Sequence, residues 1–544
     1  MPEDKVEFVL RNGLIVDGSG SPGCRGDVAV GGGEIIGLDV DSNFPAAARR
    51  IDVEGAVITP GFIDIHAHSD LSLLEDGRGL SKAFQGVTTE VNGNCSMSPA
   101  PVTAENKKRV RDTFTYMAGA VDWNWNSFEE YLKVVGDSKI ALNIVPQVGH
   151  GALRAAVVGF EPRVANEREI EEMKNLLDRA LSAGAAGMST GLVYSPCCYA
   201  DRNELVQLAA VVAEHDALFS IHMRNEGYRL LEAVEETLDI VRNTGVRTEI
   251  SHLKAAGEKN WGLVRPVVEK IDAAAEEGFE IGFDVYPYLV GSTYLSALLP
   301  RWARRGSREE LVERLKDVPT RRRLRRAILE GDADWPGYNG PGSLTPEGTT
   351  ISSVGSEKNR DLVGKTLAEI AGDRDCDPWD CFFDLLVEER GNVIGLYEYM
   401  CEEDVRFLYS HPCAAVGSDG LAISPAGHWL ESKPHPRYYG TFPRMLRRYA
   451  IEDDLLSLEE AVRRMTSLPA RRLGLKNRGL LQKGYAADIV VFNPETLEDT
   501  ATYQNPHRLA RGIEHLFVNG TPVISDSHQP TESYPGKVLT SGRS

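Results

Sequence analysis

Short apolar segments and amphipathic helical patterns alternate along the middle of the 544-residue chain. Eight segments have the length and character of buried strands, and a helical pattern follows most of them. They are GFIDIHAH, VTTEVNGNC, NIVPQVGHG, GAAGMSTGL, ALFSIHM, RTEISHL, EIGFDVYPY and AAVGSDG. This alternation is typical of a (β/α)8 barrel, in which parallel strands close into a ring covered by helices. An open, doubly wound sheet is the competing topology, but no GxGxxG motif opens a helix after an early strand.

Both ends of the chain differ from this middle part. Residues 1–58 and 475–544 contain short apolar strands separated by Gly-rich turns, as in GLIVDGSG near the start and FVNGTPVI near the end. The shared texture predicts one small β-sandwich domain assembled from the two termini. Such a split leaves the barrel as an uninterrupted insert between the two pieces.

The interval between the seventh and eighth barrel strands is too long for a simple connection. We expect strands one to seven within 59–294, an inserted small domain over 295–400, and the last strand and helix within 401–474. The insertion contains the Arg-rich stretch RWARRGSREELVERLKDVPTRRRLRRAI. A solvated helix face is the ordinary explanation for such a run, and a lid over the site is the functional one.

The formal net charge of −20 narrows the range of partners. A negative field disfavours nucleic acid and anionic membranes, so we expect neither. The start, MPEDKVEFVLRNG, lacks the apolar run of a signal peptide, and no stretch reaches transmembrane length, which predicts a cytoplasmic location. Eight cysteines in so long a chain do not indicate a disulfide framework, and most are expected to be reduced core residues. The sequence does not indicate an oligomeric state.

Histidines recur at the carboxyl ends of the predicted barrel strands, where barrel enzymes carry their chemistry. His66 and His68 close the first strand two residues apart, so both imidazoles face the same way. His222 closes the fifth strand and His252 the sixth, which makes those two side chains neighbours. Asp419 ends the last strand and faces the same mouth, although a turn or N-cap aspartate is its ordinary explanation. Each residue alone is a weak signal, and together they predict a metal or catalytic centre.

Cys95 lies in the segment GNCSMSP at the end of the second strand. A buried structural thiol, a nucleophile and a metal ligand each explain a cysteine there. A nucleophile needs a base paired with the thiol, whereas the histidines of this rim are better used on a metal. One thiolate with two imidazoles suits an open zinc site, so Cys95, His222 and His252 are the predicted ligands. The two histidines of the first strand frame a second position that Cys95 bridges.

Eight segments occur in an order that carries a family resemblance: GFIDIHAHSD, GNCSMSPAP, MSTGLVYSP, HMRNEG, SHLKAAGEKNWG, DVYPYLVGST, GSDG and KPHPRYYGTFPRML. Together they closely resemble the N-acyl-D-amino-acid deacylases, or D-aminoacylases, of the amidohydrolase superfamily. GNC, HMRNEG and HPRYYGTFPR separate this group from dihydroorotases and hydantoinases. The resemblance implies a distorted (β/α)8 TIM barrel, a small β-sandwich domain built from both termini, and an inserted small domain before the last barrel strand.

The resemblance also implies a zinc ion held tightly by Cys95, His222 and His252, and a weaker second site on the histidines of the first strand. Asp419 matches the family's catalytic aspartate. Such a residue takes a proton from the attacking water and delivers it to the leaving amine.

Four further residues match positions where the family holds the substrate. Lys254, Tyr286 and Arg437 fall where the resemblance places the carboxylate of the amino acid. Tyr194 is a further candidate for that pocket, and a half-buried loop aromatic is its ordinary explanation.

Two features set the chain apart from the pattern. Many superfamily relatives bridge two metals with a carbamylated lysine, but the fourth strand here, AGAAGMSTGL, has no lysine, which agrees with a bridging cysteine. Ser96 and Met97 stand where the family commonly has Gly-Phe, which leaves the subtype open.

The expected reaction is zinc-dependent hydrolysis of the amide bond of N-acyl-D-amino acids, releasing a carboxylate and a D-amino acid. The D configuration comes only from the resemblance. No cation accompanies Tyr294 and Leu295 after the seventh strand, which favours neutral or hydrophobic side chains, and the arginines of the insertion are the counter-argument. The alternatives are another amidohydrolase, such as a dihydroorotase-like or hydantoinase-like cyclic amidase, and a catalytically silent barrel protein.

Overall fold

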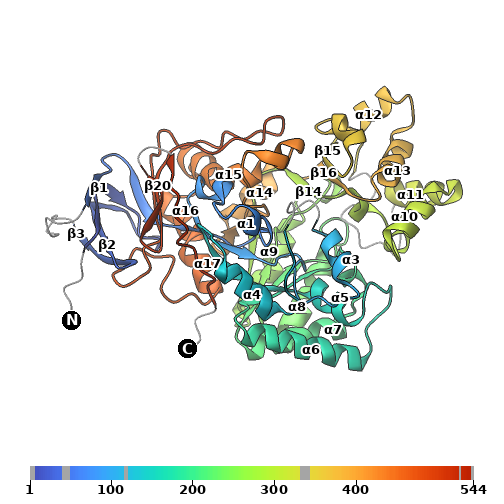
Figure 1. Ribbon diagram of the computed structural model, residues 1–544, viewed down its shortest axis with the longest axis horizontal. Coiled ribbons are helices and arrows are strands. Elements are labelled where there is room, and N and C mark those ends of the chain that lie inside the picture. The colour runs from blue at the N-terminus through green and yellow to red at the C-terminus, as the bar shows by residue number, and fades with distance from the viewer. Residues whose placement is uncertain (1–5, 40–48, 115–120, 331–343, 526–528, 541–544) are drawn as a thin grey trace.

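The computed structural model describes residues 6–39, 49–114, 121–330, 344–525 and 529–540. Figure 1 shows a sheet with strands from both ends of the chain at one end of the molecule. Parallel strands with helices around them lie in the middle, and an inserted part lies at the opposite end (Figure 1). None of the helices in the described ranges is long and apolar enough to cross a membrane.

Parallel strands form the barrel that the sequence predicts. They are β6 (Phe62–Asp64), β7 (Val87–Asn92), β8 (Asn143–Pro146), β9 (Val148–Gly149), β10 (Gly187–Gly191), β11 (Leu218–His222), β12 (Arg247–Ile250), β13 (Ile281–Val285) and β17 (Ala414–Val416). One row runs β6-β7-β8 and the other β9-β10-β11-β12-β13-β17. The consecutive strands β8 and β9 share one place, because β8 pairs with β7 and β9 with β10. The ring closes where Ala67 and Gly420 form a parallel bridge, so the distorted barrel is confirmed.

The helices around the barrel follow from their apolar faces and their caps. In α6 (Glu167–Ser182), Ile170 and Met173 are buried three residues apart, and Asn166 and Glu169 form a capping box at the start. The other long helices of this part are α4 (Phe128–Asp137), α7 (Arg202–Glu214), α8 (Leu230–Thr244), α9 (Val264–Glu276) and α14 (Glu402–Ser410). The shorter ones are α1 (Ser72–Glu75), α2 (Leu80–Ala83), α3 (Lys107–Asp112), α5 (His150–Val157), α15 (Arg437–Arg444), α16 (Leu458–Met465) and α17 (Ser467–Arg472).

One continuous sheet joins the two ends of the chain. Its strands are β1 (Phe8–Ile15), β2 (Cys24–Gly31), β3 (Glu34–Asp39), β4 (Arg49–Asp52), β5 (Val57–Pro60), β18 (Ile489–Phe492), β19 (Ile513–Val518), β20 (Thr521–Ser525) and β21 (Gln529–Pro530). Antiparallel pairing of β18 with β5 connects the two ends. The sheet curls back on itself, because Glu34 of β3 bridges to Ala486 just before β18. The layers of the predicted sandwich are therefore parts of one folded sheet around buried Val28, Ile58 and Val491.

The inserted part has a sheet and a core of its own. Its antiparallel strands are β14 (Val290–Tyr294), β15 (Thr349–Val354) and β16 (Val393–Glu398), and its helices are α10 (Arg308–Lys316), α11 (Val318–Glu330), α12 (Leu367–Asp373) and α13 (Pro378–Glu388). Leu315, Leu324 and Phe382 belong to its separate apolar cluster. β14 lies before residue 295, within the range expected for the barrel, and joins this sheet because its partner is β16.

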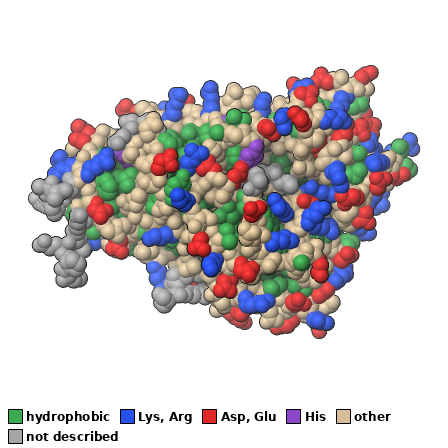
Figure 2. Space-filling view, viewed as in Figure 1, with side chains coloured by type: hydrophobic (Ala, Val, Ile, Leu, Met, Phe, Trp, Pro, Cys, Tyr) green, Lys and Arg blue, Asp and Glu red, His purple; other side chains and the backbone are tan. Residues whose placement is uncertain are grey.

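The Arg-rich stretch of the insertion divides into two groups. Arg321 of α11 pairs with Asp384 of α13 at 2.6 Å, as expected for a helix face at the surface. Arg304 instead donates to the carbonyl oxygen of Val193 in the barrel at 2.8 Å. On the face shown in Figure 2, basic and acidic side chains are interspersed over this part of the molecule. The first arginines of the stretch thus attach the insertion to the barrel.

A buried lysine connects the strands on which the barrel closes. Nζ of Lys82, in α2, lies 2.5 Å from Oδ2 of Asp64, 2.9 Å from Oε1 of Glu90 and 2.7 Å from Oγ of Ser418. Asp64 ends β6, Glu90 lies in β7, and Ser418 follows β17. Because Ser418 directly precedes Asp419, the same cluster fixes the backbone that carries this candidate catalytic residue.

We expect Lys82→Met to lower the free energy of unfolding by about 3–5 kcal/mol, because the substitution leaves two buried carboxylates without their cation. The measurement is urea-induced unfolding followed by circular dichroism. Lys174→Met is the matched control, because Lys174 is partly exposed and forms an ion pair with Glu171 of its own helix. Equal stability of the two variants would show that the buried cluster contributes nothing.

Candidate metal centre

The structure brings the predicted ligands together at the carboxyl ends of the barrel strands. His66 and His68 follow β6, Cys95 follows β7, His222 ends β11 and His252 follows β12. All five side chains are buried. Their ligand atoms fall into two groups that share the cysteine, and within each group these atoms lie within 4.8 Å of one another. One group contains the two histidines after β6, and the other contains those of β11 and β12.

The sulfur atom of Cys95 lies at the centre of this arrangement. Sγ is 3.3 Å from Nε2 of His66 and 3.5 Å from Nε2 of His252. Nε2 of His252 is in turn 3.0 Å from Nδ1 of His222. One thiolate and two imidazole nitrogens at such spacing are the donor set of an open zinc site, which leaves a fourth position for water or substrate.

Buried carboxylates stand behind three of the imidazoles. Asp284 Oδ2 lies 3.2 Å from Nδ1 of His66, and Glu226 Oε1 lies 2.9 Å from Nδ1 of His252. The other oxygen of Glu226 is 3.8 Å from Nε2 of His222. Protons on the nitrogens that face these carboxylates leave the opposite nitrogens as acceptors directed toward the cluster. Nε2 of His252 and Nδ1 of His222 lie 3.0 Å apart, so one proton or one cation can be held between them.

The electrostatics of the cluster agree with a cation site. Burial by itself raises the pKa of the Cys95 thiol, but the imidazoles of His66 and His252 hold that pKa well below its usual range. Burial lowers the pKa of His252, yet Glu226 and Cys95 together raise it to about 9. The pKa of His222 is lowered, chiefly by burial. A thiolate is therefore balanced by protons on neighbouring imidazoles, and a divalent cation can take the place of those protons.

Unusual backbone conformations occur at the residues that point into this site. Cys95, His252 and Asp419 have φ angles of 52°, 36° and 49°, in the left-handed region that few non-glycine residues adopt. Such conformations cost of order 1–3 kcal/mol each and persist where the surrounding structure enforces them. The turn before the cysteine depends on Gly93, since a Cβ atom there would lie 2.0 Å from the carbonyl oxygen of Gln147.

Asp419 lies between the ligand cluster and an arginine. Its Oδ1 is 3.0 Å from Nε2 of His68 and 3.7 Å from Nε2 of His66, and its Oδ2 is 3.0 Å from Nη2 of Arg437. Burial favours the neutral carboxyl, but Arg437 and then His68 hold the pKa of Asp419 well below its usual range. The carboxylate is therefore ionised and ready to accept a proton.

The three residues predicted to hold a carboxylate also meet here. The Arg437 guanidinium carbon lies 4.8 Å and Lys254 Nζ 5.8 Å from the centroid of the Tyr286 ring. Lys254 already donates to Glu226 at 2.7 Å. Nε and Nη1 of Arg437 are buried without a hydrogen-bond partner among the described residues, so this guanidinium retains donors for a ligand. We call Lys254, Tyr286 and Arg437 the clamp.

Tyr194 contacts both the cluster and the insertion. Its ring lies 5.2 Å from the ring of His222, and its hydroxyl is 2.9 Å from Oγ1 of Thr293 in β14. A small cavity of about 30 Å³ lies among Tyr194, Cys95, Asp419 and the clamp. The tyrosine is half-buried, so it has the exposure of a loop aromatic and also lines the candidate site.

Glu226 and Asp284 are the residues that sequence reasoning missed. Glu226 stands four residues after His222 within HMRNEG, and Asp284 lies in the seventh strand, in FDVYP. The sequence offered two signals for them, a carboxylate shortly after a predicted ligand and a carboxylate within a barrel strand. Each also has ordinary explanations, and only the folded structure shows that both face imidazoles.

Comparisons with known proteins agree with this geometry. The Amidohydrolase family matches residues 49–321 and 411–524. A D-aminoacylase from Alcaligenes xylosoxydans xylosoxydans is 35% identical over 533 residues, which cover 98% of this chain and 97% of that protein. An N-acyl-D-glutamate deacylase from the same bacterium is 34% identical over 542 residues, covering 99% and 97%. The crystal structure of N-acyl-D-glutamate deacylase from Bordetella bronchiseptica, with zinc and a phosphonate mimic of the tetrahedral intermediate, has a TM-score of 0.81 at 34% identity and covers 99% of this chain and 100% of that chain.

The chain belongs to the amidohydrolase family of metal-dependent barrel hydrolases. Within that family it groups with the N-acyl-D-amino-acid deacylases, which confirms the resemblance carried by its motifs. The family match omits residues 322–410, most of which belong to the inserted part.

We expect Cys95→Ala to lose the bound metal, because the substitution removes the sulfur that both ligand groups share. The measurement is the metal content of the purified, desalted protein by mass spectrometry. Cys376→Ala, which changes a half-buried cysteine outside the cluster, is the control. A Cys95 variant that keeps the metal content of the wild type would exclude this cysteine as a ligand.

Proposed function

We propose that this protein hydrolyses the amide bond of N-acyl-D-amino acids and releases a carboxylate and a D-amino acid. The observation that carries the proposal is the position of Asp419, within 3.0 Å of both the histidine cluster and the arginine of the clamp. Relatives that match the chain over nearly its full length are named for deacylation of linear N-acyl-D-amino acids. This favours a linear amide over a cyclic one, and an enzyme over a silent barrel protein.

Cys95, His222 and His252 are the proposed tight zinc site, and His66 and His68 with the shared thiolate are a weaker second one. When bound, zinc polarises the substrate carbonyl and lowers the pKa of a coordinated water from 15.7 to about 7. Its three protein ligands leave room for the reacting groups. The carboxylates behind the imidazoles hold the rings in the orientation that this role requires.

The protein's own contribution to bond cleavage is assigned to Asp419. Its ionised carboxylate takes a proton from the attacking water and then delivers that proton to the nitrogen of the leaving amine. Arg437 keeps the carboxylate ionised and in place from one side, and His68 does so from the other. The barrel mouth buries these groups, which strengthens their electrostatic interactions.

The clamp is the proposed seat of the α-carboxylate. Nε and Nη1 of Arg437 have no partner among the described residues, and a guanidinium N–H donates a charge-assisted hydrogen bond to a carboxylate. Lys254 adds a second positive charge, and Tyr286 supports both cations with its ring. The carboxylate fixes one end of the substrate, so the amide lies over the ligand cluster.

Around the clamp, the small cavity has an uncharged wall made by Ser292, Thr293 and Ile394. This wall supports the neutral or hydrophobic side-chain preference expected from the sequence, with Tyr194 as a further contact. Identity to relatives does not decide the point, because a relative named D-aminoacylase and two named for acidic amino acids match almost equally. The cytoplasmic location and the absence of nucleic-acid and membrane partners stay predictions from the sequence.

We expect Asp419→Asn to lower kcat by roughly 100-fold to 10,000-fold, because an amide cannot take up the proton of the attacking water. Turnover of N-acetyl-D-leucine and metal content are measured on the same preparation. The metal content should stay at the wild-type level, since the carboxylate is not among the proposed ligands of the tight site. Near-normal turnover in the metal-loaded variant would remove Asp419 from this role.

A panel of substrates tests the side-chain and chirality assignments. We expect N-acetyl-D-leucine and N-acetyl-D-methionine to be hydrolysed at least roughly tenfold better in kcat/KM than N-acetyl-D-glutamate, since an acidic side chain would be buried without a counter-charge. The L enantiomers are the controls for handedness. A preference for D-glutamate would overturn the side-chain assignment, and faster turnover of the L series would overturn the D assignment.

A further inference from the structure

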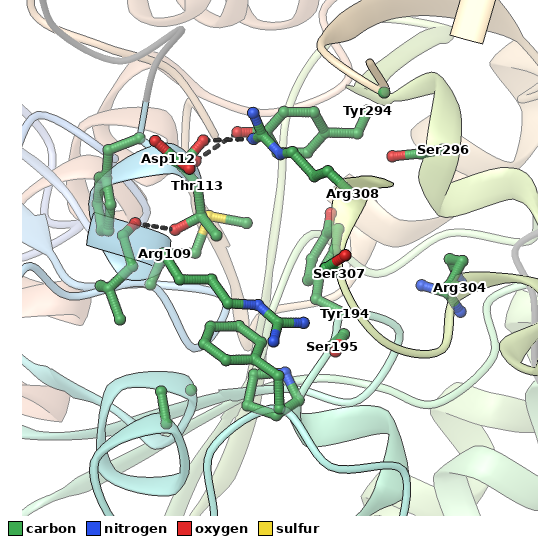
Figure 3. A pocket seen from close by; sticks show the side chains of 18 of the residues that line it. Arg109, Asp112, Thr113, Tyr194, Ser195, Tyr294, Ser296, Arg304, Ser307 and Arg308 are labelled. Carbon is green, nitrogen blue, oxygen red and sulfur yellow. Dashed lines mark hydrogen bonds between the residues drawn. The ribbon is translucent and has the colours of Figure 1, made fainter. Parts of the chain in front are cut away.

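A second, much larger cavity lies where the barrel mouth meets the insertion. Its volume is about 430 Å³, within the usual range for small-molecule sites. The barrel side of its wall includes Met97 and Tyr194, and the insertion contributes Tyr294 and the segment that leads into α10. Figure 3 shows side chains of both parts around this space. The proposed reaction does not yet use this cavity.

The large cavity and the small cavity of the metal centre share part of their walls. Met97 and Tyr194 line both of them. Met97 follows Cys95 by two residues, and the Tyr194 ring meets the His222 ring edge to face, so the shared wall stands beside the ligand cluster. The clamp residues, in contrast, belong to the small cavity and not to the described lining of the large one. The large cavity thus lies next to the ligand cluster, on a side without the clamp.

Guanidinium groups make the large cavity attractive to an anion. Arg109, Arg304 and Arg308 line it, and Figure 3 shows their side chains around the space. Their hydrogen bonds go to main-chain carbonyl oxygens, of Gly306 at 2.6 Å, Val193 at 2.8 Å and Asp112 at 2.5 Å. A carbonyl group carries no charge, so these bonds leave the positive charges in place.

Arg304 is the best placed of the three. Its Nε and Nη2 atoms are buried and have no hydrogen-bond partner among the described residues. Three acidic residues also line the cavity: Glu309 pairs with Arg390, Glu105 is exposed, and Asp112 is half-buried beside Arg308. Arg304 thus brings a guanidinium with unpaired donors to the cavity wall, and such a group favours a charge-assisted hydrogen bond with a carboxylate.

The order of groups in the substrate decides which end enters the cavity. In an N-acyl amino acid the α-carboxylate and the side chain are both attached to the carbon next to the nitrogen, whereas the acyl chain lies beyond the scissile carbonyl. With the α-carboxylate in the clamp and the carbonyl over the ligand cluster, the side chain stays near the clamp and the acyl chain points away from it. The acyl chain is the part that passes Met97 and Tyr194.

We propose that the large cavity is an acyl subsite for a dicarboxylic acid joined through one end to the D-amino acid, with its free carboxylate bound by Arg304. This inference rests on the proposed deacylase function and adds the class of acyl group. The reaction stays a hydrolysis. Water adds its hydroxyl to the acyl carbon, the carbon–nitrogen bond breaks, and the amine receives the proton, so the products are a dicarboxylate and a D-amino acid.

The test compares acyl groups on one amino acid. N-succinyl-, N-glutaryl- and N-adipyl-D-leucine are assayed beside uncharged isosteres in which an isopropyl group replaces the terminal carboxylate. For at least one chain length, we expect kcat/KM to be roughly tenfold or more above that of the isostere, as for one charge-assisted hydrogen bond. A ratio near one at every chain length overturns the inference.

Variants of the arginine locate the effect. Arg304→Gln should bring the ratio of dicarboxylic substrate to isostere close to one, and Arg304→Lys should retain part of it. Arg325→Gln is the control, because Arg325 pairs with Asp377 and is not part of the described cavity wall. A ratio that Arg304→Gln leaves unchanged overturns the assignment. A second result would also overturn the assignment. If the wild type prefers N-acetyl-D-glutamate to N-acetyl-D-leucine and Arg304→Gln abolishes that preference, the side chain of the amino acid occupies the cavity.

A binding measurement separates this inference from the deacylase function. Glutarate is titrated calorimetrically into the metal-loaded wild type and the Arg304→Gln variant, and weaker binding to the variant supports the subsite without any turnover. If the wild type hydrolyses none of the N-acyl-D-amino acids but binds glutarate more tightly than Arg304→Gln does, the deacylase function alone is overturned. Normal hydrolysis of N-acetyl-D-leucine with equal glutarate binding by both proteins would overturn the subsite alone.

Discussion

The thiolate of Cys95 is the constraint on which the centre of this molecule depends. A buried negative charge needs positive partners, and the barrel supplies imidazoles at the ends of β6, β11 and β12. Those imidazoles need carboxylates behind them, which β13 and the loop after β11 supply as Asp284 and Glu226. The sulfur atom is thus surrounded by imidazoles, and the imidazoles are in turn contacted by carboxylates. The left-handed backbone at the cysteine shows that the surrounding structure enforces its position at a cost to the chain.

The barrel closes on a second buried charge. Lys82 joins β6, β7 and the residue before Asp419, where the chain returns from the insertion to complete the ring. The histidines after β6 and the candidate catalytic carboxylate after β17 come from opposite ends of the barrel sequence, and the Lys82 cluster connects those ends. The contacts that close the barrel therefore also bring the candidate catalytic carboxylate to the site.

The insertion changes the size of the space that a substrate meets. The cavity at the ligand cluster and the clamp is small, and the larger one lies where β14 and the segment before α10 meet the barrel mouth. The sequence predicts that the arginines of the insertion form a solvated helix face. In the structure some of them form ion pairs within the insertion, and others donate hydrogen bonds to carbonyl groups of the barrel. The second group adds positive charge to the cavity, which Arg109 of α3 also lines.

The sequence by itself determined the barrel, the joined termini, the family and the set of residues at the strand ends. Strand periodicity is a local property of the sequence, and the carboxyl ends of parallel barrel strands meet at one rim. The histidines and Cys95 could therefore be grouped from the sequence alone. Only the tertiary structure decided that β14 pairs within the insertion, that Glu226 and Asp284 stand behind the imidazoles, and that Arg304 faces a cavity. These facts depend on contacts between residues far apart in the chain and on side-chain directions. No local pattern encodes which carboxylate or guanidinium will end beside a given partner.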